Sequence, residues 1–173
     1  MSEQLSAPAS LANDFLQACK ARGILVATAE SCTGGLIIAL MTDLPGSSSM
    51  VDRGFVTYSN EAKMDMLGVS EQTLKRHGAV SREAALEMVA GVLERSRAGI
   101  ALSVTGIAGP DGGSEEKPVG LVWFGIAVEG QAPFAEHRIF ENRGRDYVRH
   151  ETVKTALELG LAALSAGTEK TSG

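Results

Sequence analysis

The sequence has few of the residues that build metal centres, disulfide frameworks or cationic surfaces. Its two cysteines, Cys19 and Cys32, are too few for a disulfide framework or a zinc site made of thiolates. The three histidines, His77, His137 and His150, follow no metal-ligand spacing, so we expect no bound metal. The formal net charge of -5 disfavours nucleic-acid binding, although it leaves a small anionic ligand open.

Long apolar runs are also missing. No segment approaches the roughly 20 apolar residues of a membrane helix, and the first residues lack the basic and apolar regions of a secretory signal. We therefore expect a cytoplasmic protein without a membrane partner. The length of 173 residues indicates one domain over 1–173. Small polar residues at 1–9 and 165–173 predict loose ends around an ordered core of about 10–165.

Helical and strand-like patterns alternate along the chain. Strands separated by helices predict a parallel sheet covered on both faces, and a hairpin near the end adds an antiparallel member. We therefore expect an α/β fold, a three-layer α/β/α sandwich with a mixed, mostly parallel sheet. The predicted helices are one capped by Ser10 and stopped by Gly23, 36–44, 60–67, one capped by Ser81 and one beginning near Arg145; the predicted strands are 24–29, 50–58, 100–104, 119–128 and 134–140.

Segment 29–35 (AESCTGG) lies where a buried strand gives way to a helix. In open α/β sheets ligands bind outside the carboxyl ends of the strands. Ser31 is placed like a nucleophile at a strand-to-helix turn, and the N–H groups of the helix start are available for an anion or an oxyanion. The alternative is that Ser31 or Thr33 only caps the helix while Gly34 and Gly35 loosen the turn.

The second strand runs into segment 57–63, which should reach the same edge of the sheet. Tyr58 and Lys63 are titratable groups there, and either is able to act as a base or proton relay if burial lowers its pKa. The ordinary alternative is a rim tyrosine and a solvated lysine. No histidine falls in the segments placed at this edge, which disfavours a Ser-His-Asp triad. Cys32 is the rival nucleophile, because a thiolate at a helix N-terminus is activated by the helix dipole.

Two further segments indicate ligand binding. The glycine-rich loop 105–118 is long for a compact domain, and loops of this length are commonly binding loops or lids, the alternative being a disordered surface loop. Arg143, Arg145 and Arg149 lie at the start of the last helix, where they oppose the helix dipole. Arginines tolerate that position if they grip an anion such as phosphate; otherwise they are surface charges.

Several ordered motifs resemble the CinA C-terminal-domain family. The resemblance covers about 11–164, shows no departure inside the motifs, and is to the stand-alone form without an N-terminal molybdopterin-binding-like domain. The motifs are 29–35 (AESCTGG), 54–60 (GFVTYSN), 77–81 (HGAVS), 105–113 (TGIAGPDGG), 117–120 (KPVG) and 145–149 (RDYVR).

This resemblance implies a three-layer α/β/α sandwich and nicotinamide-nucleotide amidase activity. Nicotinamide mononucleotide and water would give nicotinic acid mononucleotide and ammonia, with no cofactor. The family's serine falls on Ser31, and its tyrosine and lysine fall on Tyr58 and Lys63. The residues expected to contact the substrate are Glu30, Cys32, Thr33, Gly34, Gly35, Thr105, Gly106, Gly109, Gly112, Arg145 and Arg149.

Other interpretations of the same residues remain. The glycines and arginines also suit a nucleotide-binding module without catalysis, and Cys32 would make the protein a cysteine hydrolase. The sequence leaves open whether Lys63 or Tyr58 is the base, which arginine holds the phosphate, and whether the chain forms a homo-oligomer.

Overall fold

The computed structural model describes residues 6–166, which alternate between helices and strands as the sequence predicted. Most predicted elements are confirmed to within a few residues at each end. The elements are α1 (Ala7–Arg22), β1 (Leu25–Glu30), α2 (Leu36–Thr42), the 3-10 turn η1 (Ser47–Ser49), β2 (Val51–Val56), α3 (Asn60–Leu67), α4 (Glu71–His77), α5 (Arg82–Glu94), β3 (Ala98–Gly106), β4 (Leu121–Val128), β5 (Phe134–Ile139) and α6 (Arg145–Ala166).

The strands form one five-stranded sheet in the order β2-β1-β3-β4-β5. Strand β1 pairs in parallel with both β2 and β3, whereas β4 runs antiparallel to β3 and β5 runs antiparallel to β4. The parallel part follows from the crossover helices between β1, β2 and β3. In the antiparallel part, the 107–120 loop joins β3 to β4 and the short connection 129–133 joins β4 to β5. The sheet is therefore mixed, as predicted.

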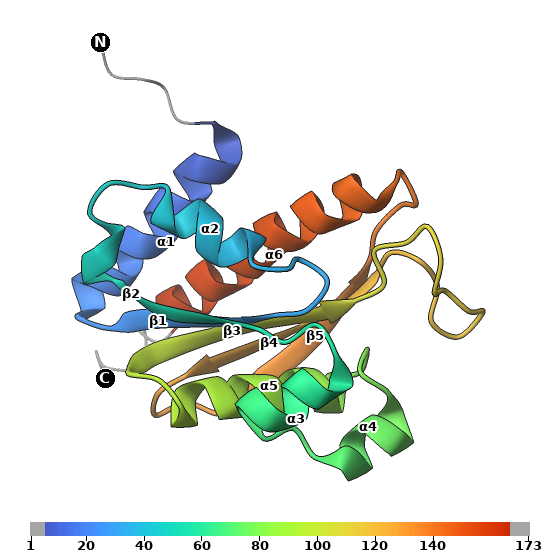
Figure 1. Ribbon diagram of the computed structural model, residues 1–173. Coiled ribbons are helices and arrows are strands. Elements are labelled where there is room, and N and C mark those ends of the chain that lie inside the picture. The colour runs from blue at the N-terminus through green and yellow to red at the C-terminus, as the bar shows by residue number, and fades with distance from the viewer. Residues whose placement is uncertain (1–5, 167–173) are drawn as a thin grey trace.

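Helices cover both faces of the sheet (Figure 1). Helices α1, α2 and α6 lie on one face, and α3, α4 and α5 lie on the other. This is the three-layer α/β/α sandwich expected from the alternation of elements. The strand ends that precede α2, α3 and the long 107–120 loop all point to the same side of the molecule, which positions the site described below.

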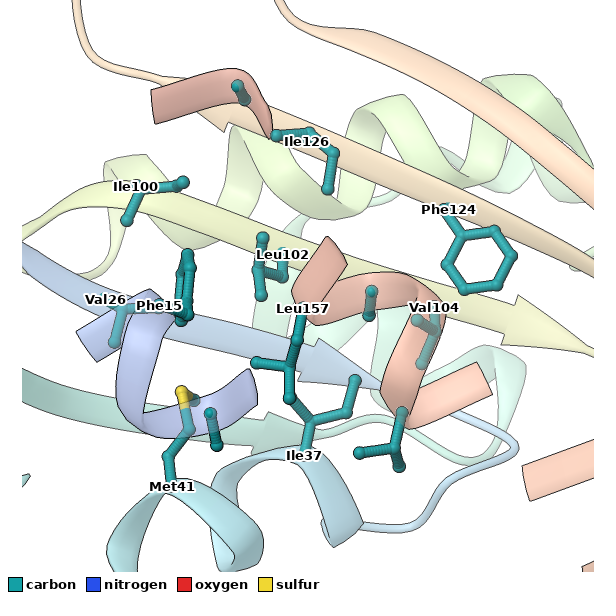
Figure 2. Close-up of a cluster of buried hydrophobic side chains, with 14 of the residues drawn as sticks. Phe15, Val26, Ile37, Met41, Ile100, Leu102, Val104, Phe124, Ile126 and Leu157 are labelled. Atoms are coloured by element: carbon teal, nitrogen blue, oxygen red, sulfur yellow. The ribbon is translucent and has the colours of Figure 1, made fainter. Parts of the chain in front are cut away.

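Two apolar clusters fill the space between the layers. The larger one joins α1, α2 and α6 to the sheet, and Figure 2 shows Phe15, Ile37, Leu102 and Leu157 within it. The smaller cluster lies under α5 and includes Met88, Val89 and Val92, as the apolar stripe of that helix predicted. Strands β1 and β3 contribute to both clusters, which explains why their apolar runs lack polar alternation.

Two boundary predictions were wrong. The first helix begins at Ala7 with Ser6 as its N-cap, not at Ser10, because Pro8 fits the first turn of a helix. Residues 7–9 are therefore helical, and 165–166 form the end of α6, whereas the sequence predicted loose ends at 1–9 and 165–173; the rest of those ends, 1–5 and 167–173, lies outside the described residues. Helix α4 was not predicted, since its seven residues are mostly polar, although the Ser70 hydroxyl caps it by accepting from Thr73 N–H. No helix within 6–166 is long and apolar enough to cross a membrane.

Candidate active site

Three parallel strands end side by side at one edge of the sheet. The last residue of β1, Glu30, is in register with Val56 of β2 and with Val104 of β3. The residues that follow are tied together by main-chain hydrogen bonds, from Ser31 N–H to the Val104 carbonyl (3.1 Å) and from Thr57 N–H to the Glu30 carbonyl (2.9 Å). The predicted segments therefore do meet at the carboxyl ends of the strands.

Ser31 and Lys63 form the closest polar pair at this edge. The Lys63 ammonium nitrogen lies 3.0 Å from the Ser31 hydroxyl oxygen. It also donates to the carbonyls of Thr57 (2.7 Å) and Tyr58 (3.4 Å). Helix α3 places the lysine, because the Ser59 hydroxyl caps the helix by accepting from Ala62 N–H and so sets where the helix begins.

The Lys63 side chain is almost completely enclosed, with 1% of its surface exposed. Burial disfavours the charged form and lowers the pKa of Lys63 from 10.5 to about 8. No acidic group forms an ion pair with it among residues 6–166. A neutral lysine has two N–H donors, which suit the Thr57 and Tyr58 carbonyls, and one lone pair, which suits the Ser31 hydroxyl proton. This arrangement equips Lys63 to act as a general base toward Ser31.

Cys32 has the opposite environment to an activated thiol. Its side chain is 5% exposed, and burial raises the pKa of the Cys32 thiol to about 11. The expected activation by a helix N-terminus is wrong, because a carboxylate already occupies the N-terminus of α2. The structure therefore favours Ser31 over Cys32 as the nucleophile.

That carboxylate belongs to Glu30, which is fully buried. It accepts hydrogen bonds from the N–H groups of Ile37 (2.8 Å) and Ile38 (3.0 Å) and from the hydroxyls of Thr33 (2.7 Å) and Thr28 (3.2 Å). The first turn of α2 is thus unavailable for an anion, contrary to the expectation from sequence. Glu30, expected to contact substrate, instead holds the 31–35 loop against the helix.

The two glycines of the loop have backbone conformations that favour glycine. Gly34 and Gly35 adopt φ values of 61° and 104°, which side chains of other residues rarely allow. They turn the chain from β1 into α2. A Cβ atom at Gly34 would face Arg149 and one at Gly35 would face Val56, and neither glycine lines the cavity described next.

A cavity of about 260 Å³ opens beside the Ser31 hydroxyl. It carries two cationic side chains, Lys63 and Arg145, and no acidic one. Of the residues predicted for the site, seven line it and the other seven, Glu30, Thr33, Gly34, Gly35, Gly109, Gly112 and Arg149, do not. The full lining is Ser31, Cys32, Tyr58, Lys63, Ala79, Val80, Thr105, Gly106, Ala108 and Arg145.

Arg145 spans the cavity mouth from the first turn of α6. Its guanidinium donates to the Gly109 carbonyl (2.9 Å) and to the Tyr58 hydroxyl (3.2 Å). The Tyr58 ring is 63% exposed, and within residues 6–166 its hydroxyl makes no hydrogen bond to Lys63 or Ser31. Tyr58 therefore lies at the rim of the cavity, and the geometry favours Lys63 as the base.

Arg149, one turn further along α6, faces the nucleophile loop instead. It donates to the carbonyls of Cys32 and Thr33, both at 3.1 Å. Arg143 stacks on the Tyr147 ring, 4.4 Å from its centroid, and does not line the cavity. Of the three arginines, Arg145 is thus the one placed to meet a ligand in the cavity.

The long loop 107–120 is ordered, not a disordered surface segment. Main-chain hydrogen bonds close it between Ile107 and Leu121 and between Gly120 and Ile107. Gly106 and Ala108 line the cavity, Gly109 contributes its carbonyl to Arg145, and Gly112 is exposed.

Thr105 lines the cavity, but its hydroxyl donates to the Ala79 carbonyl (2.8 Å). It is therefore not a free donor for an oxyanion. That bond helps to bring Ala79 and Val80 to the cavity wall. The chemistry of Ala79, Val80 and Ala108 did not mark them as site residues, because none has a polar side chain. Ala79 and Val80 were indicated only by the 77–81 motif of the family resemblance.

Within residues 6–166 no three His, Cys, Asp or Glu side chains gather closely enough to hold a metal ion. No histidine lines the cavity within this part of the chain. What the arrangement offers is a serine, a lysine with a lowered pKa and an arginine around a partly apolar cavity. Such a site suits acyl transfer from an anionic substrate.

Comparison with known proteins identifies the family. The family model of the CinA C-terminal domain matches residues 8–164. The nicotinamide-nucleotide amidohydrolase PncC of Escherichia coli (strain K12) is 54% identical over 142 residues, which cover 82% of this chain and 86% of that protein. The protein of the same name from Enterobacter agglomerans is 63% identical over 144 residues, covering 83% and 87%.

Solved structures agree on the fold. The competence/damage inducible protein CihA from Agrobacterium tumefaciens superposes with a TM-score of 0.89 at 50% sequence identity, over 95% of this chain and 99% of that one. The fold, the order of the motifs and the match over nearly the whole described chain point the same way. The chain therefore belongs to the CinA C-terminal domain family, as its motifs predicted.

Proposed function

We propose that this protein hydrolyses the carboxamide of nicotinamide mononucleotide, giving nicotinic acid mononucleotide and ammonia. The observation that carries the proposal is the 3.0 Å contact between Lys63 and Ser31 at the floor of a cationic cavity. The names of the two similar amidohydrolases support the same substrate class. The reaction needs water and no cofactor.

In the first half-reaction Ser31 attacks the amide carbonyl carbon. Its hydroxyl proton passes to the lone pair of neutral Lys63 as the oxygen–carbon bond forms. Collapse of the tetrahedral intermediate breaks the carbon–nitrogen bond, and Lys63 gives the proton to the departing ammonia. The products of this step are an acyl-enzyme on Ser31 and free ammonia.

Water completes the cycle. Lys63, again neutral, takes a proton from the attacking water, which adds to the acyl carbonyl carbon. The ester bond then breaks, Ser31 regains its proton from Lys63, and the nicotinic acid nucleotide leaves. The Thr57 and Tyr58 carbonyls hold the lysine amine in place throughout, so its lone pair stays directed at the reacting oxygen.

The negative charge that develops on the carbonyl oxygen needs donors. Within residues 6–166 the N–H groups of Cys32 and Thr33 make no main-chain hydrogen bond to another residue, whereas Gly34 N–H is already bonded to the Ser31 carbonyl. We assign the oxyanion to Cys32 and Thr33. Preorganised backbone donors of this kind are usually the largest single contribution to such catalysis.

Arg145 holds the phosphate in this proposal. It lines the cavity and is exposed at its mouth, so its guanidinium is able to exchange its present contacts for a phosphate. Gly106, Ala79, Val80 and Ala108 form a wall without charge, which suits the flat pyridine ring. Tyr58, held by Arg145, closes the rim beside them.

The location and partners complete the proposal. Both cysteines are free thiols in buried positions, which suits the reducing cytoplasm. The partner is a small nucleotide, and neither nucleic acid nor membrane takes part.

The test is release of ammonia and appearance of the carboxylate product on mixing the purified protein with nicotinamide mononucleotide. We expect turnover by the unmodified protein and none by the Ser31→Ala variant. A nucleotide-binding module would bind the mononucleotide in a calorimetric titration but release no ammonia from it. That outcome would overturn the proposed activity while leaving the cavity as a binding site.

A further inference from the structure

We infer that Arg149 is a positioning residue, which fixes the orientation of the Thr33 N–H, one of the two backbone donors assigned to the oxyanion. The inference rests on the proposed function, since it concerns how the same site stabilises its transition state. It gives Arg149 a role different from the substrate contact expected from sequence. Nothing in the role requires Arg149 to touch the substrate.

The guanidinium of Arg149 grips two successive carbonyls of the nucleophile loop. Its Nε donates to the Cys32 carbonyl and its Nη2 to the Thr33 carbonyl, each at 3.1 Å. The side chain is half-buried, and within residues 6–166 it pairs with no carboxylate. Its charge is therefore directed at the loop alone, in the forked geometry that a lysine does not reproduce.

Peptide planarity turns this grip into an orientation of N–H groups. In a trans peptide the carbonyl and the N–H of one unit point in opposite directions. A donor that holds the Cys32 carbonyl therefore turns the Thr33 N–H away from Arg149. This places the Thr33 N–H on the face of the loop opposite Arg149 and next to Cys32, which lines the cavity, while the Thr33 side chain is bound to Glu30 and does not line it.

The same contact also strengthens the donor. A hydrogen bond from a charged group to an amide carbonyl polarises the amide, which makes the N–H on its other side a better donor. The Arg149 charge thus acts on the oxyanion through the 32–33 peptide. If the guanidinium instead lay in the cavity, water would reach its charge, and it would bind the substrate and the transition state equally well, which does not raise kcat.

A second anchor holds the loop from another direction. The buried Glu30 carboxylate accepts from the Thr33 hydroxyl at 2.7 Å. Rotation of the peptide between Cys32 and Thr33 would break the Arg149 contact while the Thr33 side chain stays tethered. Arg149 is therefore the group whose removal frees that peptide without releasing the whole loop.

The experiment compares Arg149→Met, Arg149→Lys and Lys154→Met with the unmodified enzyme. Lys154 is a matched control, since it is an exposed cation on the same helix that pairs only loosely with Glu158 (3.9 Å). For Arg149→Met we expect kcat on nicotinamide mononucleotide to fall roughly tenfold to a hundredfold. KM and the affinity for nicotinic acid mononucleotide should change by no more than about twofold. Arg149→Lys should recover part of kcat, and Lys154→Met should match the unmodified enzyme.

A second measurement does not depend on the substrate. A fluorophosphonate modifies an activated serine through the same developing oxyanion, so its rate of reaction with Ser31 should fall by the same order in Arg149→Met. If the unmodified protein releases no ammonia, the proposed amidohydrolase activity is wrong, but the labelling rate still tests the role of Arg149. An unchanged labelling rate and unchanged kcat in Arg149→Met would overturn the inference. A rise in KM with kcat unchanged would overturn it too and make Arg149 a substrate contact, and a joint loss of labelling, product binding and melting temperature would make it merely structural.

Discussion

The side-chain nitrogen of Lys63 and the hydroxyl oxygen of Ser31 lie 3.0 Å apart, although 32 positions separate the two residues in the chain. Parallel pairing of β1 with β2 brings their carboxyl ends together, and α3 returns the lysine over that edge. The lysine is enclosed without an acidic partner in the described chain, so burial controls its pKa. Several consequences of this pairing are measurable.

Replacing the serine and the neighbouring cysteine separately tests the nucleophile. Ser31→Ala should abolish ammonia release while substrate binding and the fold are retained. Cys32→Ala should keep kcat within about threefold, because its buried thiol, with a pKa raised to about 11, takes no part in the chemistry. An inactive Cys32→Ala variant beside an active Ser31→Ala variant would reverse the assignment.

The Lys63→Met variant tests the base. Its kcat should fall by roughly a hundredfold or more, the usual scale for loss of a general base. The melting temperature at pH 7 should hold or rise, because an apolar side chain of similar length replaces a buried ammonium group. Lys154→Met is the control for loss of a lysine at an exposed site. A large fall in melting temperature would instead make Lys63 a structural residue.

The lowered pKa of Lys63 predicts two pH dependences. Since only neutral Lys63 accepts the serine proton, kcat/KM should rise with pH and level off above about pH 8. Between pH 8 and 10.5 Lys63 is protonated in the unfolded chain and neutral in the folded one. The free energy of unfolding of the unmodified protein should therefore increase with pH over this range, compared with that of the Lys63→Met variant. Chemical denaturation of both proteins across this range measures the second effect; parallel curves would contradict it.

Removal of Arg145 should act on binding. A charge-assisted contact is worth about 1.5 to 3 kcal/mol, so Arg145→Ala should raise KM for the mononucleotide by roughly tenfold to a hundredfold. Nicotinamide riboside lacks the phosphate and should be a poor substrate that is almost insensitive to the substitution. Equal losses on both substrates would remove Arg145 from the phosphate site.

The buried carboxylate of Glu30 predicts a loss of stability. In the unmodified protein the two carboxylate oxygens accept from the N–H groups of Ile37 and Ile38. Glu30→Gln replaces one of these oxygens with an amide NH2 group, which cannot accept a hydrogen bond from the N–H that faces it. We expect the free energy of unfolding to fall by about 2 kcal/mol or more, measured by urea denaturation. Glu158→Gln, at an exposed position on α6, should be nearly neutral. Similar effects of both substitutions would show that the cap is not important for stability.

The sequence by itself determined the layers of this protein, because apolar periodicity and turn residues act over short distances. The buried runs of β1 and β3, the cap at Ser81 and the family motifs were all readable in this way. The same local information placed Ser31, Tyr58 and Lys63 at one edge of the sheet. Local sequence did not predict helix α4, because its seven mostly polar residues carry no apolar stripe.

Tertiary structure alone decided what each side chain at that edge does. Glu30, Arg145 and Arg149 are all charged residues near strand or helix ends, and local sequence does not tell them apart. Glu30 caps α2 because its strand is buried between two others, whereas Arg145 faces the cavity and Arg149 faces the loop because one helical turn displaces them along α6. The partners of a charged group come from segments distant in the chain, and only the packing of those segments selects which contacts it makes.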